Sequence, residues 1–242
     1  MKTWNWGILG QGVIASQMAD ALMKEHGGIY AVAGRPMNKV LAFAEKYTVQ
    51  HCYDIESLLQ DEAVDIVYIA TPHTYHYDYM MKALRHGKHV LCEKAITVNH
   101  KQLQEVMQLA QEKGLIVMEA MTIFHMPVFQ KARELVESGA IGKLKMLQVN
   151  FGSCKEYDIH NRFFSKELAG GALLDIGVYA VSFALYFLSS KPDVILTTCN
   201  YFETGVDEES GILMKNKEGQ LVVSALTMRA KQPKRGVIAR SE

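Results

Sequence analysis

A glycine turn near the start of the chain limits its fold more than any other feature. An apolar run, Trp4 to Leu9, stops at Gly10-x-Gly12-x-x-Ala15, and a helical pattern begins at once. A strand, a glycine turn and a helix in this order open a dinucleotide-binding unit, whose pyrophosphate sits on the helix N-terminus. The expected phosphate contacts are Gly10, Gly12, Val13 and Ile14. Other α/β proteins, methyltransferases among them, have similar turns, so the rest of the chain must decide.

Strand and helix patterns alternate from this turn to about residue 121. The predicted strands span 4–9, 29–33, 65–70, 89–92 and 115–118, and the predicted helices begin at 13 and span 37–47, 79–86 and 99–113. This alternation predicts a parallel, doubly wound sheet with helices between its strands. We therefore expect an α/β dinucleotide-binding (Rossmann) domain over residues 1–121.

The pattern changes in the second half. Helices are predicted at 128–138 and 171–188, strands at 143–151, 194–200, 211–214, 220–228 and 236–239, and a hairpin turn at 216–219. These segments predict an α+β domain over residues 122–242 with a mostly antiparallel sheet. A sheet that ended at the last strand would leave an unpaired edge. The second domain is therefore either incomplete at its C-terminus in this chain or has this edge covered by a partner.

Composition excludes several classes of protein. The chain has 242 residues, 49% of them hydrophobic, which is enough for a sizeable core in one or two domains. Its 26 basic and 26 acidic residues create no positive field for nucleic acid. No apolar run reaches the roughly 20 residues of a membrane span, and the N-terminus lacks a signal-peptide core. Four scattered cysteines indicate free thiols in a reducing cytoplasm.

The second predicted strand ends in Gly34-Arg35. An acidic residue at this point of a dinucleotide fold would bind the ribose 2′-hydroxyl of NAD. Here Gly34 leaves room, and Arg35 offers a planar cation suited to a 2′-phosphate. The pair favours NADP over NAD, against the alternative that Arg35 is an ordinary surface arginine.

The strand at 89–92 is followed by Glu93-Lys94. Counted as the fourth strand of a doubly wound sheet, it is expected beside the first strand, where ligands bind outside the carboxyl ends. Lys94 would then reach the crevice of the glycine turn and stabilise an alkoxide on the substrate. Glu93 would hold the lysine in place. The competing interpretation is a salt bridge at the rim of the sheet.

A third group of candidates lies in an apolar helix that begins after Gly170-Gly171. Asp175 and Tyr179 are four residues apart and share one helix face. An aspartate on an apolar helix needs a partner or a function. Tyr179 could donate and accept the reacting proton, with its pKa lowered by Lys94. Alternatively, Asp175 only caps a buried phenol.

Other polar residues follow the predicted strands. Thr71-Pro72 and His73-x-x-His76 lie near the crevice mouth, where polar contacts to cofactor or substrate, or helix capping, are expected. Because no cysteine or carboxylate stands at ligand spacing, we expect no metal site. Glu119 ends the fifth predicted strand on the same side and is expected to line the pocket. Arg162 belongs to a polar, aromatic stretch that either covers the crevice or forms an ordinary loop.

Together these stretches resemble the Gfo/Idh/MocA family of sugar, polyol and dihydrodiol dehydrogenases over essentially the whole chain. The residues that carry the resemblance are the glycine turn, Thr71-Pro72, Glu93-Lys94 and the segment from Gly170 to Tyr179. Glu119-Ala120-Met121 and Arg162-Phe163-Phe164 are similar to the branch of dimeric dihydrodiol (xylose) dehydrogenases and glucose–fructose oxidoreductase.

The resemblance implies roles for these residues. Lys94 is the catalytic lysine, Tyr179 the acid/base and Asp175 a ligand of substrate hydroxyls, with Arg162 and Glu119 also on the substrate side. The cofactor contacts extend to Thr71, Pro72, His76, Glu93 and Lys94. The branch favours NADP and forms a homodimer through the second-domain sheet. Ala95 replaces the family's usual proline after the lysine, often preceded by a cis bond. Since a cis bond before alanine costs about 3 kcal/mol, we predict a trans Lys94–Ala95 bond and a slightly shifted Lys94 loop.

The sequence thus predicts an NADP-dependent oxidoreductase that moves hydride between nicotinamide and a hydroxyl-bearing carbon of a sugar, polyol or cyclic diol. A catalytically silent NAD(P)-binding sensor or regulatory protein of the same fold is the alternative from another class. A methyltransferase is a third interpretation, which Glu93-Lys94 disfavours.

Overall fold

The computed structural model of the protein describes residues 3–241. The chain forms two compact units, one extending to Ala120 and the other starting at Met121. Each unit has hydrophobic core clusters of its own. The two units are described separately.

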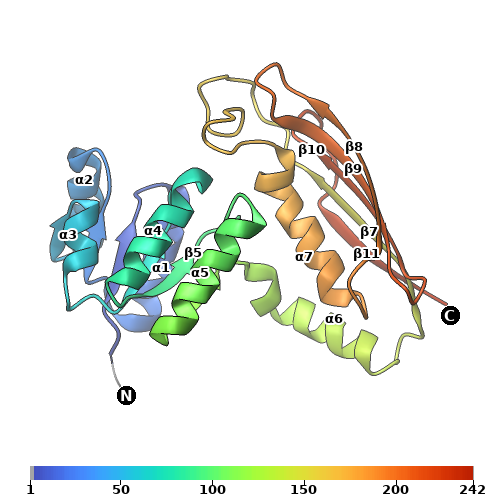
Figure 1. Ribbon diagram of the computed structural model, residues 1–242, viewed down its shortest axis with the longest axis horizontal. Helices are drawn as coiled ribbons and strands as arrows, with labels where there is room; N and C mark the ends of the chain where they lie inside the picture. Colours follow the sequence, from blue (N-terminus) through green and yellow to red (C-terminus); the bar gives the residue numbers. More distant parts are fainter. Residues whose placement is uncertain (1–2, 242) are drawn as a thin grey trace. The chain divides into compact units, whose positions relative to one another are not determined.

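The first unit is built on a six-stranded parallel sheet with the strand order β3-β2-β1-β4-β5-β6. Its strands are β1 (Trp6–Leu9), β2 (Ala31–Ala33), β3 (His51–Tyr53), β4 (Ile66–Ile69), β5 (His89–Cys92) and β6 (Val117–Glu119). Its helices are α1 (Val13–His26), α2 (Met37–Tyr47), α3 (Ile55–Gln60), α4 (His73–Arg85) and α5 (His100–Lys113). The predicted doubly wound Rossmann sheet is confirmed (Figure 1).

The sheet is buried on both faces, as its short apolar strands require. On one face Ile8 and Val32 pack with residues of α1 and α2, and on the other Leu9 and Ala33 pack with residues of α3, α4 and α5. Local capping residues bound α5: the Asn99 side chain accepts a hydrogen bond from the Gln102 amide, and Gly114 ends the helix in the left-handed region.

Two elements of the first unit were missed from the sequence, and one conclusion drawn from the strand count is wrong. β3 has only three half-buried residues and α3 only six residues, so neither produces a periodic apolar pattern. With β3 included, the strand before Glu93-Lys94 is β5, and β4 rather than β5 lies beside β1. The carboxyl end of β5 still lies at the same sheet edge as that of β1, because all six strands are parallel. In addition, α4 begins at His73, six residues before the predicted start at Tyr79.

The second unit contains a five-stranded sheet with the order β11-β7-β10-β9-β8. Its strands are β7 (Leu144–Gly152), β8 (Val194–Tyr201), β9 (Asp207–Lys215), β10 (Leu221–Thr227) and β11 (Arg235–Arg240). Its helical segments are η1 (Thr122–His125), α6 (Pro127–Glu137), the π-helical turn η2 (Leu173–Gly177) and α7 (Val178–Phe187). Only the β7–β10 pair is parallel, so the predicted mostly antiparallel sheet is confirmed.

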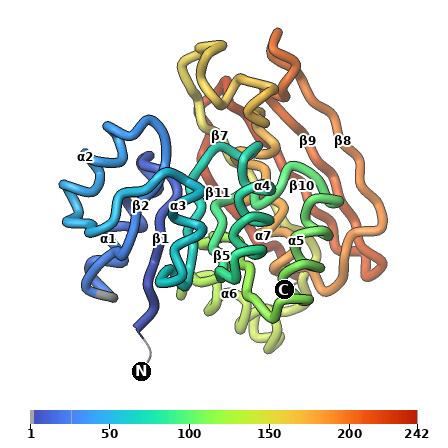
Figure 2. Tube along the Cα trace, turned by 60° about the vertical axis from the view of Figure 1, so that its left-hand side comes forward, coloured from blue at the N-terminus to red at the C-terminus, as the bar shows by residue number. Residues whose placement is uncertain are grey.

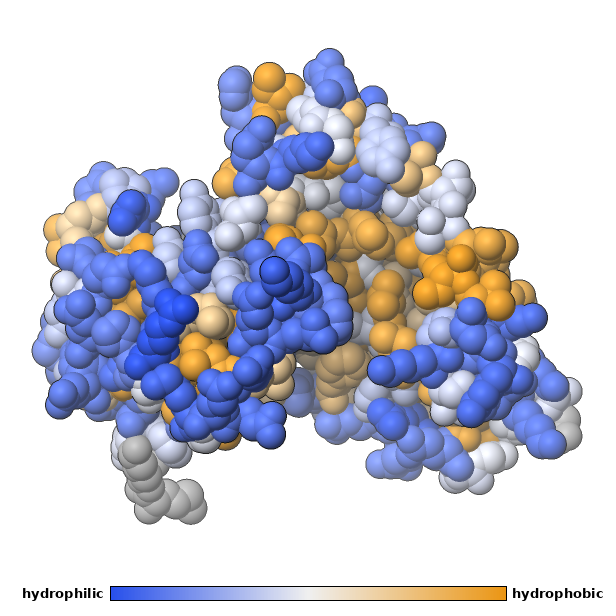
Figure 3. Space-filling model, viewed as in Figure 1, coloured by the Kyte–Doolittle hydropathy of each residue, from blue (hydrophilic) through white to orange (hydrophobic). Residues whose placement is uncertain are grey.

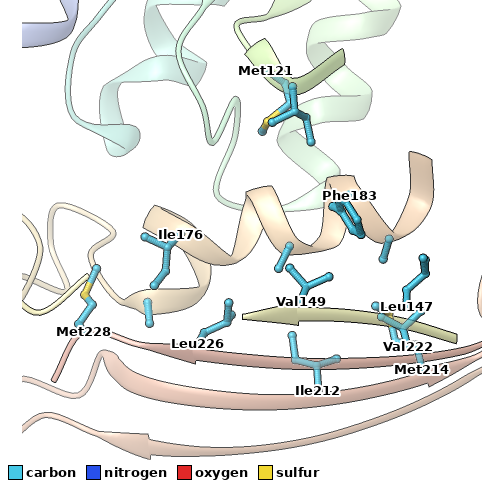
Figure 4. Close-up of a cluster of buried hydrophobic side chains, with 14 of the residues drawn as sticks. Met121, Leu147, Val149, Ile176, Phe183, Ile212, Met214, Val222, Leu226 and Met228 are labelled. Carbon is cyan, nitrogen blue, oxygen red and sulfur yellow. The ribbon is translucent and has the colours of Figure 1, made fainter. Parts of the chain in front are cut away.

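One face of this sheet forms the core of the second unit. Ile176 and Phe183 point from η2 and α7 toward buried side chains of the strands, among them Leu147 and Val222 (Figure 4). β8 lies at the edge of this sheet, and all eight of its residues are exposed on both of its faces; Figure 2 shows it beside β9 at the end of the sheet.

Two general properties follow from the described residues. In the part of the chain from 3 to 241, no helix combines the length and the apolar character that a membrane span requires. The four cysteines, Cys52, Cys92, Cys154 and Cys199, are free thiols.

Candidate functional site

The glycine turn adopts a backbone that only glycine accommodates at its first position. Gly10 has φ +115°, and a Cβ atom there would stand 2.5 Å from the Ala70 carbonyl oxygen. Its amide donates a hydrogen bond to the Ala33 oxygen at 3.0 Å. The turn is therefore held between the ends of β2 and β4, at the carboxyl edge of the sheet.

Helix α1 opens toward solvent at this turn. Gly12 is its N-cap and supplies no side chain, and its first turn contains no acidic residue. Val13 and Ile14 are 76% and 43% exposed, an unusual position for apolar side chains. An accessible helix N-terminus attracts anions through its amides and its dipole. The predicted phosphate contacts thus lie where a pyrophosphate would fit.

The turn after β4 offers a buried donor. The Thr71 hydroxyl is shielded from solvent and has no hydrogen-bond partner among the described residues. A buried hydroxyl without a partner costs free energy unless a ligand or water satisfies it. The residue therefore fits a ligand held near Gly10, as a bound dinucleotide would be.

The end of β2 carries the residues predicted to choose between NADP and NAD. The Gln11 side chain donates to the Ala33 oxygen at 2.8 Å and occupies the space above Gly34. Arg35 is exposed. Hydrogen bonds from Ser57 lower the pKa of Asp54, and the charge of Arg35 adds to this effect, so the guanidinium lies near the carboxylate.

The Lys94 loop follows β5. The Lys94–Ala95 peptide bond is cis, so the predicted trans bond is wrong. The prediction used only the intrinsic preference of the bond, whereas tertiary hydrogen bonds hold both carbonyl groups of this segment. His73 Nε2 lies 3.1 Å from the Lys94 oxygen, and His76 Nδ1 lies 2.9 Å from the Ala95 oxygen. The Arg35–Pro36 bond is also cis.

Two carboxylates flank the loop. Glu93 accepts a hydrogen bond from the Tyr68 hydroxyl at 2.5 Å and one from the Lys94 amide at 3.3 Å. Glu119 accepts from the Ile96 amide at 2.9 Å. Burial raises the pKa of Glu119, which the Ile96 hydrogen bond partly offsets. Burial and the bond to Glu93 together raise the pKa of Tyr68. Glu93 and Glu119 both hold backbone of the segment that carries Lys94.

In the second unit, Asp175 lies in the π-helical turn η2 and Tyr179 in the first turn of α7. Asp175 is 6% exposed and forms an ion pair with Arg162, whose Nη2 is 3.7 Å from its Oδ1. The Tyr179 ring stacks on Phe151, with centroids 5.6 Å apart. The structure thus brings Asp175 together with Arg162.

The start of η2 depends on a residue that the sequence did not reveal. Asp207 accepts a hydrogen bond from the Leu173 amide at 2.7 Å, and its carboxylate fills the space that a Cβ of Gly171 would need. Gly171 has φ +103°. Tyr68, which holds Glu93, likewise looks in the sequence like any other residue of its strand. Neither residue carries a local signal, because both act through contacts distant in sequence.

A cavity of about 360 Å³ lies within the second unit, between α6, α7 and β7. Most of its lining is apolar. Tyr179 contributes to it together with Phe129, Phe151, Phe183, Phe187 and Lys234. Lys234 places its ammonium 4.8 Å from the centre of the Phe151 ring, so a cation borders an aromatic wall.

The candidate residues therefore fall into two sets. Gly10, Thr71 and Lys94, with their neighbours, line one edge of the sheet in the first unit; Arg162, Asp175 and Tyr179 belong to the second. Within residues 3–241, no group of three or more histidine, cysteine, aspartate or glutamate side chains is arranged to hold a metal ion.

Comparison with known families matches both halves of the chain. Residues 4–121 match the oxidoreductase family with an NAD-binding Rossmann fold, GFO/IDH/MocA, and residues 129–240 match the GFO/IDH/MocA C-terminal domain. Among individual proteins, trans-1,2-dihydrobenzene-1,2-diol dehydrogenase of Xenopus tropicalis is 32% identical over 239 residues, which is 96% of this chain and 72% of that protein. The protein of the same name from Homo sapiens is 34% identical over 216 residues, 87% of this chain and 64% of that one.

Solved structures share the fold of both units. KijD10, a 3-ketoreductase from Actinomadura kijaniata in complex with NADP and TDP-benzene, has a TM-score of 0.92 and 25% identity, and covers 99% of this chain and 74% of its own. An NAD binding oxidoreductase from Klebsiella pneumoniae has a TM-score of 0.83 and 25% identity, with 95% and 68% covered.

Proposed function

Since the chain belongs to the GFO/IDH/MocA oxidoreductase family and is an NAD(P)-dependent oxidoreductase, we propose that it uses NADP to oxidise a hydroxyl-bearing carbon of a cyclic diol, sugar or polyol, or to reduce the matching ketone. Membership of this family rules out the methyltransferase interpretation. The observation that carries the proposal is the position of the Lys94 loop, at the same sheet edge as the glycine turn and the unpartnered Thr71 hydroxyl.

The residues divide the chemistry between them. Gly10, Gly12 and the amide end of α1 would hold the pyrophosphate of NADP, which supplies the hydride acceptor at its nicotinamide. The Lys94 ammonium donates to the substrate oxygen and stabilises the negative charge that develops there. Tyr179 as the phenolate takes the hydroxyl proton in oxidation, and as the phenol it returns the proton in reduction. Asp175, held by Arg162, binds a neighbouring substrate hydroxyl.

The cavity beside Tyr179 supports a cyclic diol as the first substrate to test. Its aromatic lining suits the apolar ring of such a diol, the substrate class in the name of the Xenopus and human relatives. The test measures NADP reduction with trans-1,2-dihydrobenzene-1,2-diol, xylose and inositol, alongside the melting temperature with NADP and with NAD. We expect stabilisation by NADP and turnover of the diol. Stabilisation by NADP without turnover of any of the three compounds would contradict the proposed reaction.

Arg35 is proposed to select NADP. Helix α2 begins two residues later, at Met37, with no acidic residue in its first turn and no side-chain cap, so its N-terminus also favours an anion. We expect Arg35→Ala to weaken NADP binding about 10- to 100-fold, the loss of a charged hydrogen bond worth about 1.5–3 kcal/mol, and to leave NAD binding nearly unchanged. Isothermal titration with both cofactors measures this.

The control for Arg35 is Lys46→Ala, which removes one positive charge from the last turn of the same helix. It should not change the ratio of the two dissociation constants. An equal loss of NADP and NAD affinity in Arg35→Ala would show that the guanidinium does not read the 2′-phosphate.

We further propose that the protein is a homodimer formed through the outer face of the second-unit sheet. On this face Leu196 of β8 pairs with Leu213 of β9, and the two side chains are 61% and 43% exposed. Val194 and Leu221, 41% and 37% exposed, extend the same face. Figure 3 shows hydrophobic atoms gathered over the part of the second unit where β8 and β9 run in Figure 1. An apolar patch of this kind marks an interface.

Leu196→Lys should convert the dimer into a monomer, because it buries an unpaired charge at the proposed interface. Sedimentation analysis distinguishes the 27.2 kDa chain from a species of twice that mass. Met107→Lys, which replaces an exposed apolar residue of α5 in the first unit, is the matched control and should remain dimeric. A monomeric wild type, or a dimeric Leu196→Lys variant, would refute the interface.

A further inference from the structure

A single buried histidine joins two segments of the first unit. His76, in the first turn of α4, has no exposed surface. Its Nε2 lies 2.8 Å from the Thr71 carbonyl oxygen and its Nδ1 lies 2.9 Å from the Ala95 carbonyl oxygen. Both partners are carbonyl oxygens, which accept, so the ring donates to both only when each of its nitrogens carries a proton, as in the imidazolium. In that form the ring connects the turn after β4 to the loop after β5.

The segment that His76 Nδ1 contacts, at Ala95, also carries Lys94. His73 Nε2 lies 3.1 Å from the Lys94 carbonyl oxygen, and Ala95 is 4% exposed. On the other side, Glu119 from β6 accepts from the Ile96 amide. Contacts from α4 and from β6 therefore fix this segment, whereas the Lys94 side chain itself is only half-buried.

We infer that His76 is a positioning residue, which fixes the Lys94 backbone and couples it to the Thr71-Pro72 turn of the cofactor site. The inference rests on the proposed function in that it takes Lys94 to be the catalytic lysine. The sequence predicts that His76 contacts the cofactor. Because both of its ring nitrogens face backbone carbonyls, we infer instead that His76 holds these two backbone segments in place. Misplacing a catalytic group by about 1 Å can cost on the order of 100-fold in rate.

Two variants separate the two contacts. The amide nitrogen of asparagine stands near the position of Nδ1, and that of glutamine near the position of Nε2. His76→Asn therefore keeps a donor toward Ala95, and His76→Gln keeps a donor toward Thr71. Leu84→Ala, in the core on the same helix, is the control for general destabilisation.

Three quantities are measured: hydrogen exchange of the peptide spanning residues 93–97, the NADP dissociation constant, and kcat with trans-1,2-dihydrobenzene-1,2-diol. For His76→Gln we expect exchange at least about tenfold faster and kcat at least about tenfold lower, with NADP affinity within about threefold of wild type. For His76→Asn we expect the reverse: exchange and kcat near wild type, and weaker NADP binding. Leu84→Ala should lower the melting temperature without changing loop exchange, kcat or NADP affinity selectively.

The inference is overturned if the two His76 variants change loop exchange and kcat equally. It is also overturned if both variants only lower the melting temperature, as Leu84→Ala does. A wild type that binds NADP without oxidising the diol would count against the proposed function alone. The exchange and binding measurements would then still decide the role of His76: a loop that loses protection in the glutamine variant and keeps it in the asparagine variant supports the coupling, and any other result refutes it.

Discussion

Replacing Lys94 with methionine is expected to abolish turnover while NADP binding stays nearly intact. Methionine keeps the approximate length of the side chain but removes its charge and its hydrogen-bond donors. Loss of one donor to a developing oxyanion costs about 10²–10³-fold in kcat, and the loss of a full charge should cost at least as much. The hydrogen bonds that hold the loop involve the Lys94 backbone, so its fold should survive. Steady-state kinetics with the diol and a fluorescence titration with NADPH measure the two effects.

The matched control is Lys82→Met. Lys82 lies on α4, is partly exposed and pairs with Glu56. Because an exposed ion pair contributes at most about 1 kcal/mol, this variant should keep nearly full activity. If Lys94→Met lost NADP binding together with turnover, the lysine would be a cofactor ligand rather than the residue that stabilises the alkoxide.

Tyr179→Phe is expected to lower kcat by about 10²–10⁴-fold, the usual contribution of a general acid or base. The ring remains, so its stacking on Phe151 and its place in the cavity lining should be kept. The pH profile of kcat/KM should lose the limb that reports ionisation of the phenol, while KM changes little. Hydride transfer measured between pH values on both sides of neutrality gives this profile.

Tyr186→Phe is the control on the same helix, since Tyr186 packs against Phe124 and Phe187. It should leave both kcat and the pH profile unchanged. A Tyr179→Phe variant with wild-type kcat and a raised KM would show that the phenol binds substrate without transferring the proton.

The parts of the fold that could be predicted are those with local signals. The α2 boundaries at Met37 and Tyr47 follow from the apolar spacing of Val40, Phe43 and Ala44, and those of α5 follow from its caps. The strands β1 and β4 are short apolar runs between breakers, and parallel strands produce such runs because both of their faces are buried.

The parts that could not be predicted depend on contacts between distant residues. β3 is a strand of three half-buried residues that pairs with β2, too short to show a pattern, and without it the strand count gives Lys94 the wrong place in the sheet. The cis bond after Lys94 lies among hydrogen bonds from His73 and His76, about twenty residues earlier. The carboxylate that caps η2 comes from Asp207, and nothing near Leu173 in the sequence indicates it.

The cap on η2 also sets an order of events during synthesis. Asp207 is made 34 residues after Leu173, so a ribosome adding about 5–20 residues per second needs roughly 2–7 s to supply it. The sheet of the first unit depends on no residue after Glu119, because every strand that pairs in it has been made by then. On a growing chain, the nucleotide-binding unit can therefore finish folding while the turn that carries Asp175 is still waiting for the carboxylate that completes it.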